Sequence, residues 1–227
     1  MNNTSNVDLS QTLVSIENYL KFLKENRIEY IQKLPKKKSD KVVKLEALRE
    51  EILKSNKCPL YKNRTNLVFG EGNPDARLVF VGEAPGQRED ELGKPFVGRS
   101  GELLTKIIEA MGLTRDEVYI CNVIKCRPPE NRDPLDSEIE QCEPYLIKQL
   151  DIIKPEMICT LGRFAAQTLL KTKTPITQLR GNFHLYNNIK LMPTFHPAAV
   201  LRNPNLKRDV WEDMKKVMAE LNLPIKK

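Results

Sequence analysis

The sequence contains no long apolar run, and this absence argues against one class of protein. Its longest apolar stretches fall far short of the roughly 18 residues that span a bilayer. The first 25 residues are polar and contain no small-residue cleavage site, so they do not resemble a signal peptide. Internal repeats are also missing, and so are low-complexity segments apart from one lysine run. We therefore expect a cytoplasmic, intracellular protein without a membrane partner.

Cysteine and histidine are scarce. The 227 residues include five cysteines and two histidines. In an intracellular protein, five cysteines argue against a disulfide framework, so they are candidates for core residues, metal ligands or nucleophiles. A chain of this length suits one domain plus an extension, and such a domain needs no disulfide or metal to hold its core.

Positive charge exceeds negative charge. Lysine and arginine number 37 against 30 acidic residues, which gives a net charge of +7 and a pI near 9.1. This balance is compatible with binding to a phosphate backbone, although many basic proteins bind no nucleic acid. Composition therefore permits a DNA partner without specifying one.

The first 39 residues predict a helical extension. Between residues 8 and 34, apolar residues recur at helical spacing: Leu9, Leu13, Ile16, Leu20, Leu23, Ile28 and Ile31. Pro35 ends this pattern, and the following run from Lys36 to Asp40 is interpreted as a solvated hinge, with phosphate contact as the alternative. A second helix is predicted from about Asp40 to Ser55. We assign residues 1–39 to an N-terminal helical extension without identifiable chemistry and residues 40–227 to the main domain.

From Cys58 onward, strand-like and helix-like segments alternate. The predicted strands are Leu78–Val81, Val118–Val123, Met157–Leu161 and Ile189–Pro193. The predicted helices are Glu102–Met111, Leu135–Leu150, Arg163–Leu170 and Arg208–Leu221. This alternation indicates an α/β fold, a three-layer α/β/α arrangement with a central four-stranded parallel sheet. The strand ends then deliver four loops to one edge of the sheet, where such folds bind ligands.

The loop after the first predicted strand is long and rich in glycine. Residues 77–101 read RLVFVGEAPGQREDELGKPFVGRSG, and the glycines predict that a buried strand leads into an extended loop. Such long loops without secondary structure are usually functional or disordered. The alternative is an ordinary connection with a solvated acidic face. The glycine spacing fits neither GxGxxG nor GxxxxGK[ST], which argues against dinucleotide and P-loop binding.

Two later loops each carry one polar candidate. Asn122 ends a predicted strand, and its amide presents a donor and an acceptor side by side, as recognition of a base edge requires. A turn residue is the alternative. His196 follows another strand at the edge where the loops converge, although an isolated histidine is more often structural. His184 has no such context and is assigned a structural role.

Five motifs occur in these loops in a fixed order. They are GEAPG at 82–86, Glu89-Asp90, PFVG at 95–98, NVIKCRPP at 122–129 and HPAAVLRNP at 196–204. In this order and at this spacing they resemble the family 4 uracil-DNA glycosylases, the iron–sulfur type. The resemblance runs from about Ser55 to Leu221 and leaves the N-terminal helices outside.

The resemblance implies hydrolysis of the N-glycosidic bond of deoxyuridine in DNA, which leaves an abasic site for base-excision repair. Because that bond lies within the base stack, the nucleotide must be flipped into a pocket. The resemblance implies that Phe96 stacks on uracil and that Asn122 pairs with uracil O4 and N3–H. It also implies that His196 donates toward O2, where negative charge grows as uracil leaves.

Further roles come from the same resemblance. Glu83, with the backbone N–H of Ala84, is expected to sit against the base and sugar and help to position water. Glu89 or Asp90 is expected to stabilise the cationic sugar or to fix the loop. Catalysis by such a set depends on stabilising the leaving group more than on a strong general base.

DNA contacts are expected outside the pocket. Leu201 and Arg202 form the expected wedge that fills the gap left by the flipped nucleotide. Phosphate contacts position a duplex without reading its sequence. The candidates, each of which could equally be a solvated surface charge, are Lys94, Arg99, Arg127 and Arg132.

The family holds a [4Fe–4S] cluster with four cysteines, and this chain departs from that pattern. Cys58, Cys126 and Cys142 match three ligand positions, whereas Ser55 stands where the fourth cysteine is expected. Thiolates are the usual ligands of such clusters. Three outcomes are compatible with this set: a cluster with one iron bound by Ser55 or water, a labile cluster, or no cluster. We favour the three-cysteine cluster and interpret the other two cysteines as core residues.

Two alternatives compete with a monomeric glycosylase. A uracil-DNA binding or trapping protein would capture the base without turnover. The trapping relative of the family has a basic, histidine-containing insertion, which the short segment Cys126–Asp133 lacks. An inactive domain that makes protein contacts through the N-terminal helices is the other alternative, and the intact set of Phe96, Asn122 and His196 argues against it.

Overall fold

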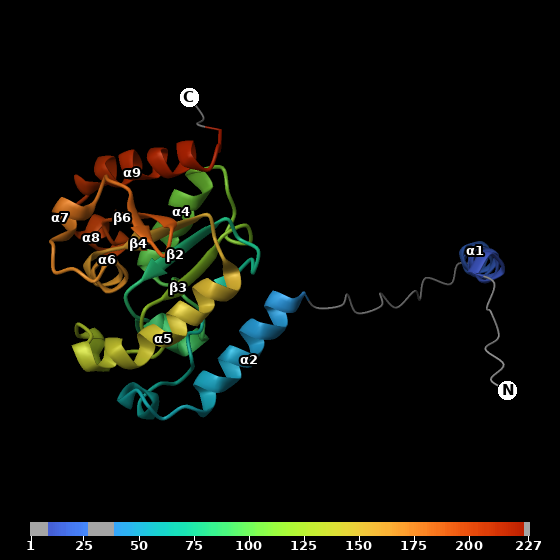
Figure 1. Cartoon of the computed structure of the whole chain (residues 1–227), viewed down its shortest axis with the longest axis horizontal. Helices are drawn as coiled ribbons and strands as arrows, with labels where there is room; N and C mark the ends of the chain where they lie inside the picture. The colour runs from blue at the N-terminus through green and yellow to red at the C-terminus, as the bar shows by residue number, and fades with distance from the viewer. Residues whose placement is uncertain (1–8, 27–38, 225–227) are drawn as a thin grey trace. The chain divides into compact units, whose positions relative to one another are not determined.

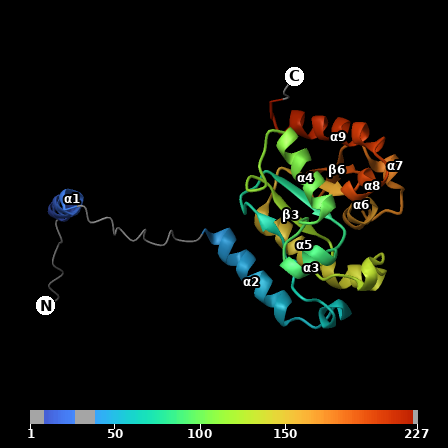
Figure 2. The same ribbon diagram turned by 180° about the vertical axis from the view of Figure 1, so that it is seen from behind.

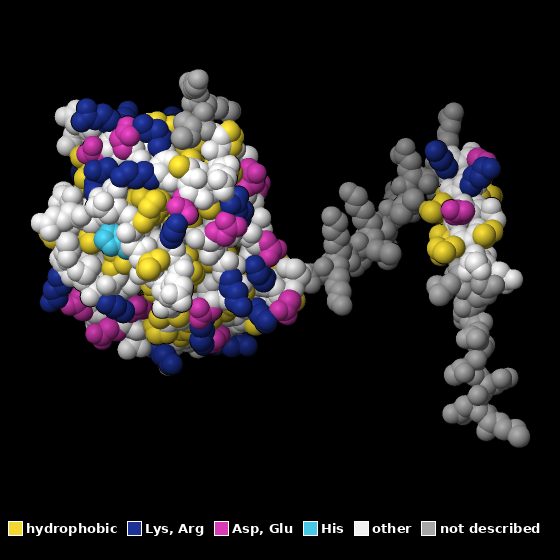
Figure 3. Space-filling model, turned by 45° about the horizontal axis from the view of Figure 1, so that its top comes forward, with side chains coloured by type: hydrophobic (Ala, Val, Ile, Leu, Met, Phe, Trp, Pro, Cys, Tyr) yellow, Lys and Arg dark blue, Asp and Glu magenta, His cyan; other side chains and the backbone are white. Residues whose placement is uncertain are grey.

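The computed structural model describes residues 9–26 and 39–224, which belong to two units divided between residues 38 and 39. In the first unit, helix α1 spans Leu9–Glu25 (Figure 1). Large apolar side chains such as Leu13 and Ile16 are exposed on it, and Figure 3 shows apolar side chains on its surface. The helix expected in this region is therefore confirmed as far as residue 25. Residues 27–38, with the expected hinge as far as Lys38, lie outside the described residues, whereas its last two residues, Ser39 and Asp40, start the next helix as its cap and its first residue.

The second unit is built on a sheet of six strands in the order β1-β3-β2-β4-β6-β5. The strands are β1 Glu71–Gly72, β2 Leu78–Gly82, β3 Tyr119–Asn122, β4 Met157–Leu161, β5 His184–Tyr186 and β6 Ile189–Thr194. The four central strands pair in parallel, as predicted. The two edge strands pair antiparallel and flank the predicted central parallel sheet, and the sequence reasoning did not find them.

The two edge strands escaped prediction because they are very short. β1 has two residues and β5 has three, and neither length gives a readable alternation of apolar and polar residues. β5 and β6 form a hairpin through Asn187 and Asn188, whose φ angles are 46° and 66°. Two residues with positive φ are typical of the tight turn in a two-residue hairpin, and asparagine tolerates that conformation.

Helices cover both faces of the sheet. The helices of the second unit are α2 Asp40–Lys54, α3 Gln87–Leu92, α4 Arg99–Ala110, α5 Asp136–Ile153, α6 Arg163–Leu170, α7 Ile176–Leu179, α8 Pro197–Arg202 and α9 Leu206–Glu220. Short 3₁₀ helices occupy η1 Pro59–Lys62 and η2 Pro129–Asn131. Figures 1 and 2 show α2 and α5 on one side of the sheet and α4 and α9 on the other. The predicted three-layer α/β/α architecture is therefore confirmed.

Each face of the sheet has its own apolar core. Val79 and Val81 of β2 pack into a cluster with α2, α5 and α6, whereas Leu78 and Phe80 pack into a cluster with α4, α8 and α9. Successive residues of a strand point to opposite faces, so a strand buried on both faces is apolar throughout, as β2 is. No helix in the described parts of the chain is both long enough and apolar enough to cross a membrane.

The loop after β2 contains more secondary structure than we expected. α3 lies within it, and α4 begins at Arg99 rather than at Glu102. The acidic residues in the first turn of α3 suit the positive end of the helix dipole. Gly93, with φ of 67°, ends α3 in the left-handed conformation that favours glycine. Because Gly82 of β2 is in register with Asn122 of β3, this loop starts level with the loop after β3.

Candidate active site

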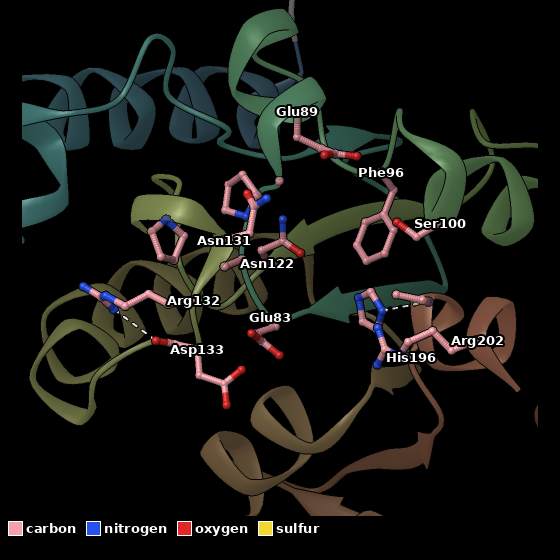
Figure 4. Close-up of a pocket in the computed structure, with 15 residues that line it drawn as sticks. Glu83, Glu89, Phe96, Ser100, Asn122, Asn131, Arg132, Asp133, His196 and Arg202 are labelled. Atoms are coloured by element: carbon pink, nitrogen blue, oxygen red, sulfur yellow. Dashed lines mark hydrogen bonds between the residues drawn. The ribbon is translucent and has the colours of Figure 1, made fainter.

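A cavity of about 360 Å³ lies at the carboxyl ends of the central strands (Figure 4). Fifteen residues line it. Those that we predicted from the sequence are Glu83, Ala84, Glu89, Phe96, Asn122, Arg132, His196 and Arg202. Residues from three loops, which follow β2, β3 and β6, therefore meet at the edge that the sheet topology predicts, whereas the loop after β4 contributes none of the fifteen.

Phe96 forms one wall of the cavity and is held in an unusual backbone conformation. Its φ angle is 52°, which is uncommon for a bulky residue and marks a site that its surroundings hold in place. Arg115 provides this restraint, since its guanidinium donates to the carbonyl oxygens of Phe96 at 3.2 Å and Pro95 at 2.9 Å. Gly101 lies so close to the Phe96 carbonyl group that a Cβ atom there would overlap it.

Asn122 presents an unused acceptor to the cavity. The residue is 2% exposed, and its Oδ1 atom accepts no hydrogen bond from the described residues. Its backbone carbonyl accepts a 2.7 Å hydrogen bond from the fully buried ammonium group of Lys125, which also donates to the Gln149 side chain. Because a buried polar atom is normally satisfied, the Asn122 amide is prepared for a ligand that brings a donor.

His196 is neutral, and one of its tautomers is selected. It caps the N-terminus of α8, where its Nδ1 atom accepts a 3.1 Å hydrogen bond from the N–H of Ala198. Burial lowers the pKa of His196 to about 4, and the positive charge of Arg202 acts in the same direction. Nδ1 therefore carries no proton at neutral pH, so the proton is on Nε2. His196 can donate one hydrogen bond to a ligand without carrying charge.

Glu83 follows β2 directly and is half-buried in the cavity. Burial raises the pKa of its carboxyl group to about 7, with a further increase from the negative charge of Asp133 and an opposing effect from Arg163. The carboxyl group is therefore poised between its protonated and ionised forms near neutral pH. Such a shift in a cavity is typical of a group that takes part in chemistry.

The two acidic residues of α3 fix the loop. One carboxylate oxygen of Glu89 accepts hydrogen bonds from the N–H groups of Val97 and Gly98, both at 2.9 Å, at the start of α4. Asp90 accepts hydrogen bonds from the N–H groups of Thr65 and Asn66 and does not line the cavity. Of the pair that we considered for contact with the sugar, only Glu89 therefore reaches the cavity.

Comparison with known proteins identifies this arrangement. Residues 69–215 match the uracil DNA glycosylase superfamily. A type-4 uracil-DNA glycosylase of Sulfurisphaera tokodaii is 49% identical over 182 residues, which cover 76% of this chain and 83% of the relative. The chain belongs to the type-4 uracil-DNA glycosylases.

A second type-4 uracil-DNA glycosylase, from Thermotoga maritima, is 48% identical over 176 residues, which cover 76% of this chain and 92% of that protein. A type-5 uracil-DNA glycosylase of Pyrobaculum aerophilum is 28% identical over 164 residues, which cover 65% of this chain and 71% of that protein. The sequence is therefore more similar to these type-4 relatives than to this type-5 relative, and type 4 is the family that its motifs resemble.

Of the residues expected to contact DNA in this type-4 chain, Arg132 and Arg202 line the cavity. Leu201 and Arg202 end α8, where Leu201 is 42% exposed. Two of the four candidate phosphate contacts are engaged in ion pairs, because Lys94 pairs with Glu71 at 2.8 Å and Arg132 pairs with Glu138. Figure 3 shows Lys and Arg side chains interspersed with acidic ones on the face that it presents.

Arg127 and Arg99 remain as candidate phosphate contacts. Arg127 donates a 2.8 Å hydrogen bond to the Asn131 side chain, and Arg99 is exposed in the first turn of α4. A hydrogen bond to a neutral amide leaves the positive charge of Arg127 uncompensated. These two arginines therefore suit the DNA backbone better than Lys94 and Arg132 do.

Three buried cysteines on separate segments come together beside the cavity loops. The thiols of Cys58 and Cys142 share a hydrogen bond, which lowers the pKa of Cys58 to about 7. Burial raises the pKa of Cys126, whose Sγ atom lies 3.5 Å from Nη1 of Arg64. Ser55, in the fourth expected position, shares a 2.9 Å hydrogen bond with the Tyr145 hydroxyl. This donor set is consistent with the iron–sulfur cluster of the family.

No single-metal site is formed in the described segments. There, no group of three or more His, Cys, Asp or Glu side chains could hold one metal ion. A four-iron cluster does not require such convergence, because each thiolate binds a different iron atom. The other two cysteines, Cys121 and Cys159, are fully buried in β3 and β4, as expected of core residues.

Three residues of the site were missed by the sequence reasoning. Arg115 restrains Phe96, Lys125 supports the backbone of Asn122, and Asp133 lines the cavity near Glu83. Lys125 lies inside the NVIKCRPP motif, so its position was visible although its burial was not. No pattern in the sequence marks Arg115, because its contacts reach back 19 and 20 residues to a different loop.

Proposed function

We propose that this chain is a uracil-DNA glycosylase that binds an extruded deoxyuridine in the cavity and hydrolyses its N-glycosidic bond. The observation that carries the proposal is the buried, unpartnered Oδ1 atom of Asn122 beside Phe96. Uracil supplies the missing donor through N3–H. The reaction releases free uracil and leaves an abasic site for base-excision repair.

Recognition combines stacking with one amide. The face of uracil stacks on Phe96 after the nucleotide leaves the duplex. Oδ1 of Asn122 accepts from uracil N3–H, and its amide N–H donates to uracil O4. Cytosine presents the opposite pattern, with an acceptor at N3 and a donor at the exocyclic amine. A site that leaves buried polar groups unpaired rejects the wrong base strongly.

His196 stabilises the leaving group. As the bond between C1′ and N1 breaks, its electron pair moves into the uracil ring and negative charge develops at O2. The neutral imidazole donates its Nε2–H to that oxygen. Because the donor is fixed in place by Ala198 and needs no reorganisation, it acts like the donor of an oxyanion hole.

The acidic side of the cavity acts on the sugar and water. Departure of uracil leaves positive charge on the deoxyribose ring, which the ionised carboxylate of Glu83 stabilises. Glu83 and the N–H of Ala84 position the water molecule whose oxygen bonds to C1′, and the water loses one proton to uracil or solvent. Glu89 supports this arrangement through the start of α4.

DNA binds over the rim of the cavity. Leu201 and Arg202 enter the space that the extruded nucleotide leaves in the stack, and Arg127 and Arg99 contact phosphates. We propose that the enzyme works as a monomer. Its substrate and its five cysteines, none of which forms a disulfide, both suit the cytoplasm, where thiols stay reduced.

Cys58, Cys126 and Cys142 would hold an iron–sulfur cluster, with Ser55 or water as the fourth ligand. When bound, the cluster supplies structural crosslinks rather than chemistry. Cys58 follows α2, Cys126 lies in the loop after β3, and Cys142 lies in α5. Linking these three segments stabilises the loop that begins at Asn122.

The decisive experiment uses a single-stranded and a duplex oligonucleotide that each contain one uracil. Alkali-labile cleavage and free uracil are expected with the wild-type protein and not with thymine or cytosine at the same position. Asn122→Ala and His196→Ala should lose most of the activity. If wild-type protein produces no alkali-labile sites, the glycosylase proposal is wrong. If it retains the oligonucleotide without releasing uracil, the trapping function replaces it.

A further inference from the structure

A second carboxylate lies beside Glu83. Asp133 follows η2 and lines the same cavity as Glu83, although the two residues belong to different loops. Figure 4 shows both carboxyl groups on the side of the cavity away from Phe96. The negative charge of Asp133 acts on Glu83 and is, after burial, the main reason for the raised pKa of Glu83.

Arg163 holds this second carboxylate in place. Its Nη2 atom lies 3.0 Å from Oδ2 of Asp133. Arg163 is the first residue of α6, and its guanidinium lies 4.2 Å from the centroid of the Phe164 ring, a cation–π contact that restricts its movement. Arg163 also lowers the pKa of Glu83. Asp133 and Arg163 therefore act on the pKa of Glu83 in opposite directions.

The other ionisable side chains around the cavity are hydrogen-bonded, uncharged or act on a group other than Glu83. The Glu89 carboxylate is used by backbone N–H groups at the start of α4. Arg132 forms two hydrogen bonds with Glu138, and His196 is neutral. Arg202 lies beside His196 on α8 and acts on that ring. Asp133 and Arg163 are therefore the charges best placed to act on Glu83.

We propose that Asp133 and Arg163 are positioning residues that together set the protonation state of Glu83 during uracil excision. The inference rests on the proposed function, in which the ionised form of Glu83 stabilises the sugar cation and positions water. Asp133 favours the protonated form and Arg163 favours the ionised form. The balance between them thereby sets the pH at which the enzyme gains activity.

Two substitutions that remove charges of opposite sign test this proposal. The rate of uracil release under saturating substrate is measured from pH 5 to 9 for wild type, Asp133→Asn, Arg163→Gln and the control Asp136→Asn. Asp136 lies three residues from Asp133 in the first turn of α5, outside the cavity. Asp133→Asn should move the midpoint of the acid limb to lower pH and Arg163→Gln to higher pH, each by roughly 0.5 unit because both charges are solvent-exposed. Asp136→Asn should not move it.

A second readout does not depend on activity. In protein labelled with ¹³C at glutamate carboxyl carbons, the signal that disappears in Glu83→Gln reports the titration of Glu83, and its midpoint should shift in the same opposite directions. Shifts of equal sign, or no shift in either variant, would overturn the inference. Absence of uracil release from every protein would refute the proposed function instead, while the carboxyl titration would still decide the inference.

Discussion

The ring of Phe96 lies 5.6 Å from the ring of His196, centroid to centroid, and the two planes are inclined by 32°. A base sandwiched between two parallel rings needs roughly 3.5 Å on each side, or about 7 Å in total. The spacing is too small and the tilt too large for such a sandwich. The base therefore stacks on Phe96 and meets His196 at its edge, which is where a hydrogen-bond donor is useful.

Replacing His196 should affect the chemical step more than binding. We expect His196→Ala to lower kcat by about 10²- to 10³-fold with little change in KM, because the donor acts on charge that develops only as the bond breaks. The measurement is single-turnover and steady-state release of uracil. His184→Ala is the matched control, since the His184 ring nitrogen Nε2 lies 3.0 Å from the Leu179 carbonyl oxygen, outside the cavity. A large rise in KM with unchanged kcat would contradict the assignment.

Gly82 is expected to be essential because a side chain at this position would not fit, and not because its backbone needs a conformation that only glycine adopts. A Cβ atom at this position would lie 2.5 Å from Cζ of Phe96 and even closer to Oδ1 of Asn122. Gly82→Ala should therefore displace both residues that recognise the base and reduce kcat/KM by roughly tenfold or more. Gly112→Ala provides the contrast, because no atom lies within 4 Å of its added Cβ but its φ is +80°. Gly112→Ala should lower the stability of the protein because of this backbone conformation and leave kcat/KM unchanged.

The positions of Asn122 and His196 could be predicted because each follows an apolar segment that was recognisable as a strand. Parallel strands bring their carboxyl ends to one edge, so two residues 74 positions apart in the numbering were expected to meet. Both residues line the same cavity in the structure. Sequence reasoning succeeded here because it needed only the order and direction of strands.

The conformation of Phe96 could not be predicted in this way. Its left-handed backbone depends on Arg115, whose side chain crosses from a different loop, and on the missing side chain of Gly101. The burial of Lys125 is similar, because local sequence predicts that a lysine is exposed. Its ammonium group is buried only because the Asn122 carbonyl and the Gln149 side chain accept from it. Such networks depend on tertiary contacts that no local pattern contains.

The ionised carboxylate of Glu83 should lower the unfolding free energy of the protein at the pH where the enzyme is active. The pKa of its carboxyl group is about 7 in the folded protein and about 4.5 without the fold, so the native state binds more protons between these values. The contribution of Glu83 to the stability of the wild type should therefore fall as pH rises from 4.5 through 7. Glu83→Gln removes this loss. After allowance for solvent screening, we expect the variant to be more stable by roughly 1–2 kcal/mol at pH 8 and about equal to wild type at pH 4.5.

Urea unfolding of both proteins at pH 4.5, 6 and 8 checks this expectation. The informative quantity is the difference in unfolding free energy between Glu83→Gln and wild type, because it cancels the titration of all other groups. The difference should grow with pH while uracil release is lost in the variant. A difference that is the same at every pH would show that Glu83 is not buried as a charged group.

Ser55→Cys should strengthen iron binding. The hydroxyl of Ser55 is a poor iron ligand, and it already shares a hydrogen bond with Tyr145. A cysteine there supplies the fourth thiolate, so protein purified without air should retain its iron and its visible thiolate-to-iron absorbance longer than wild type when exposed to air. Cys126→Ala should lose both, and Cys159→Ala, which changes a fully buried core cysteine, should lose neither at a temperature where it is folded.

The wild-type protein itself separates the remaining outcomes for the cluster. Iron and absorbance in an anaerobic preparation would support three cysteine ligands with a hydroxyl or water at the fourth iron. Their absence from wild type, together with their appearance in Ser55→Cys, would show that this chain has lost its cluster through one substitution. Uracil release should then differ little between the two proteins at low temperature, because the cluster links segments rather than contacting the base. The difference should appear on heating, when the loop that begins at Asn122 depends on the segments that the cluster joins.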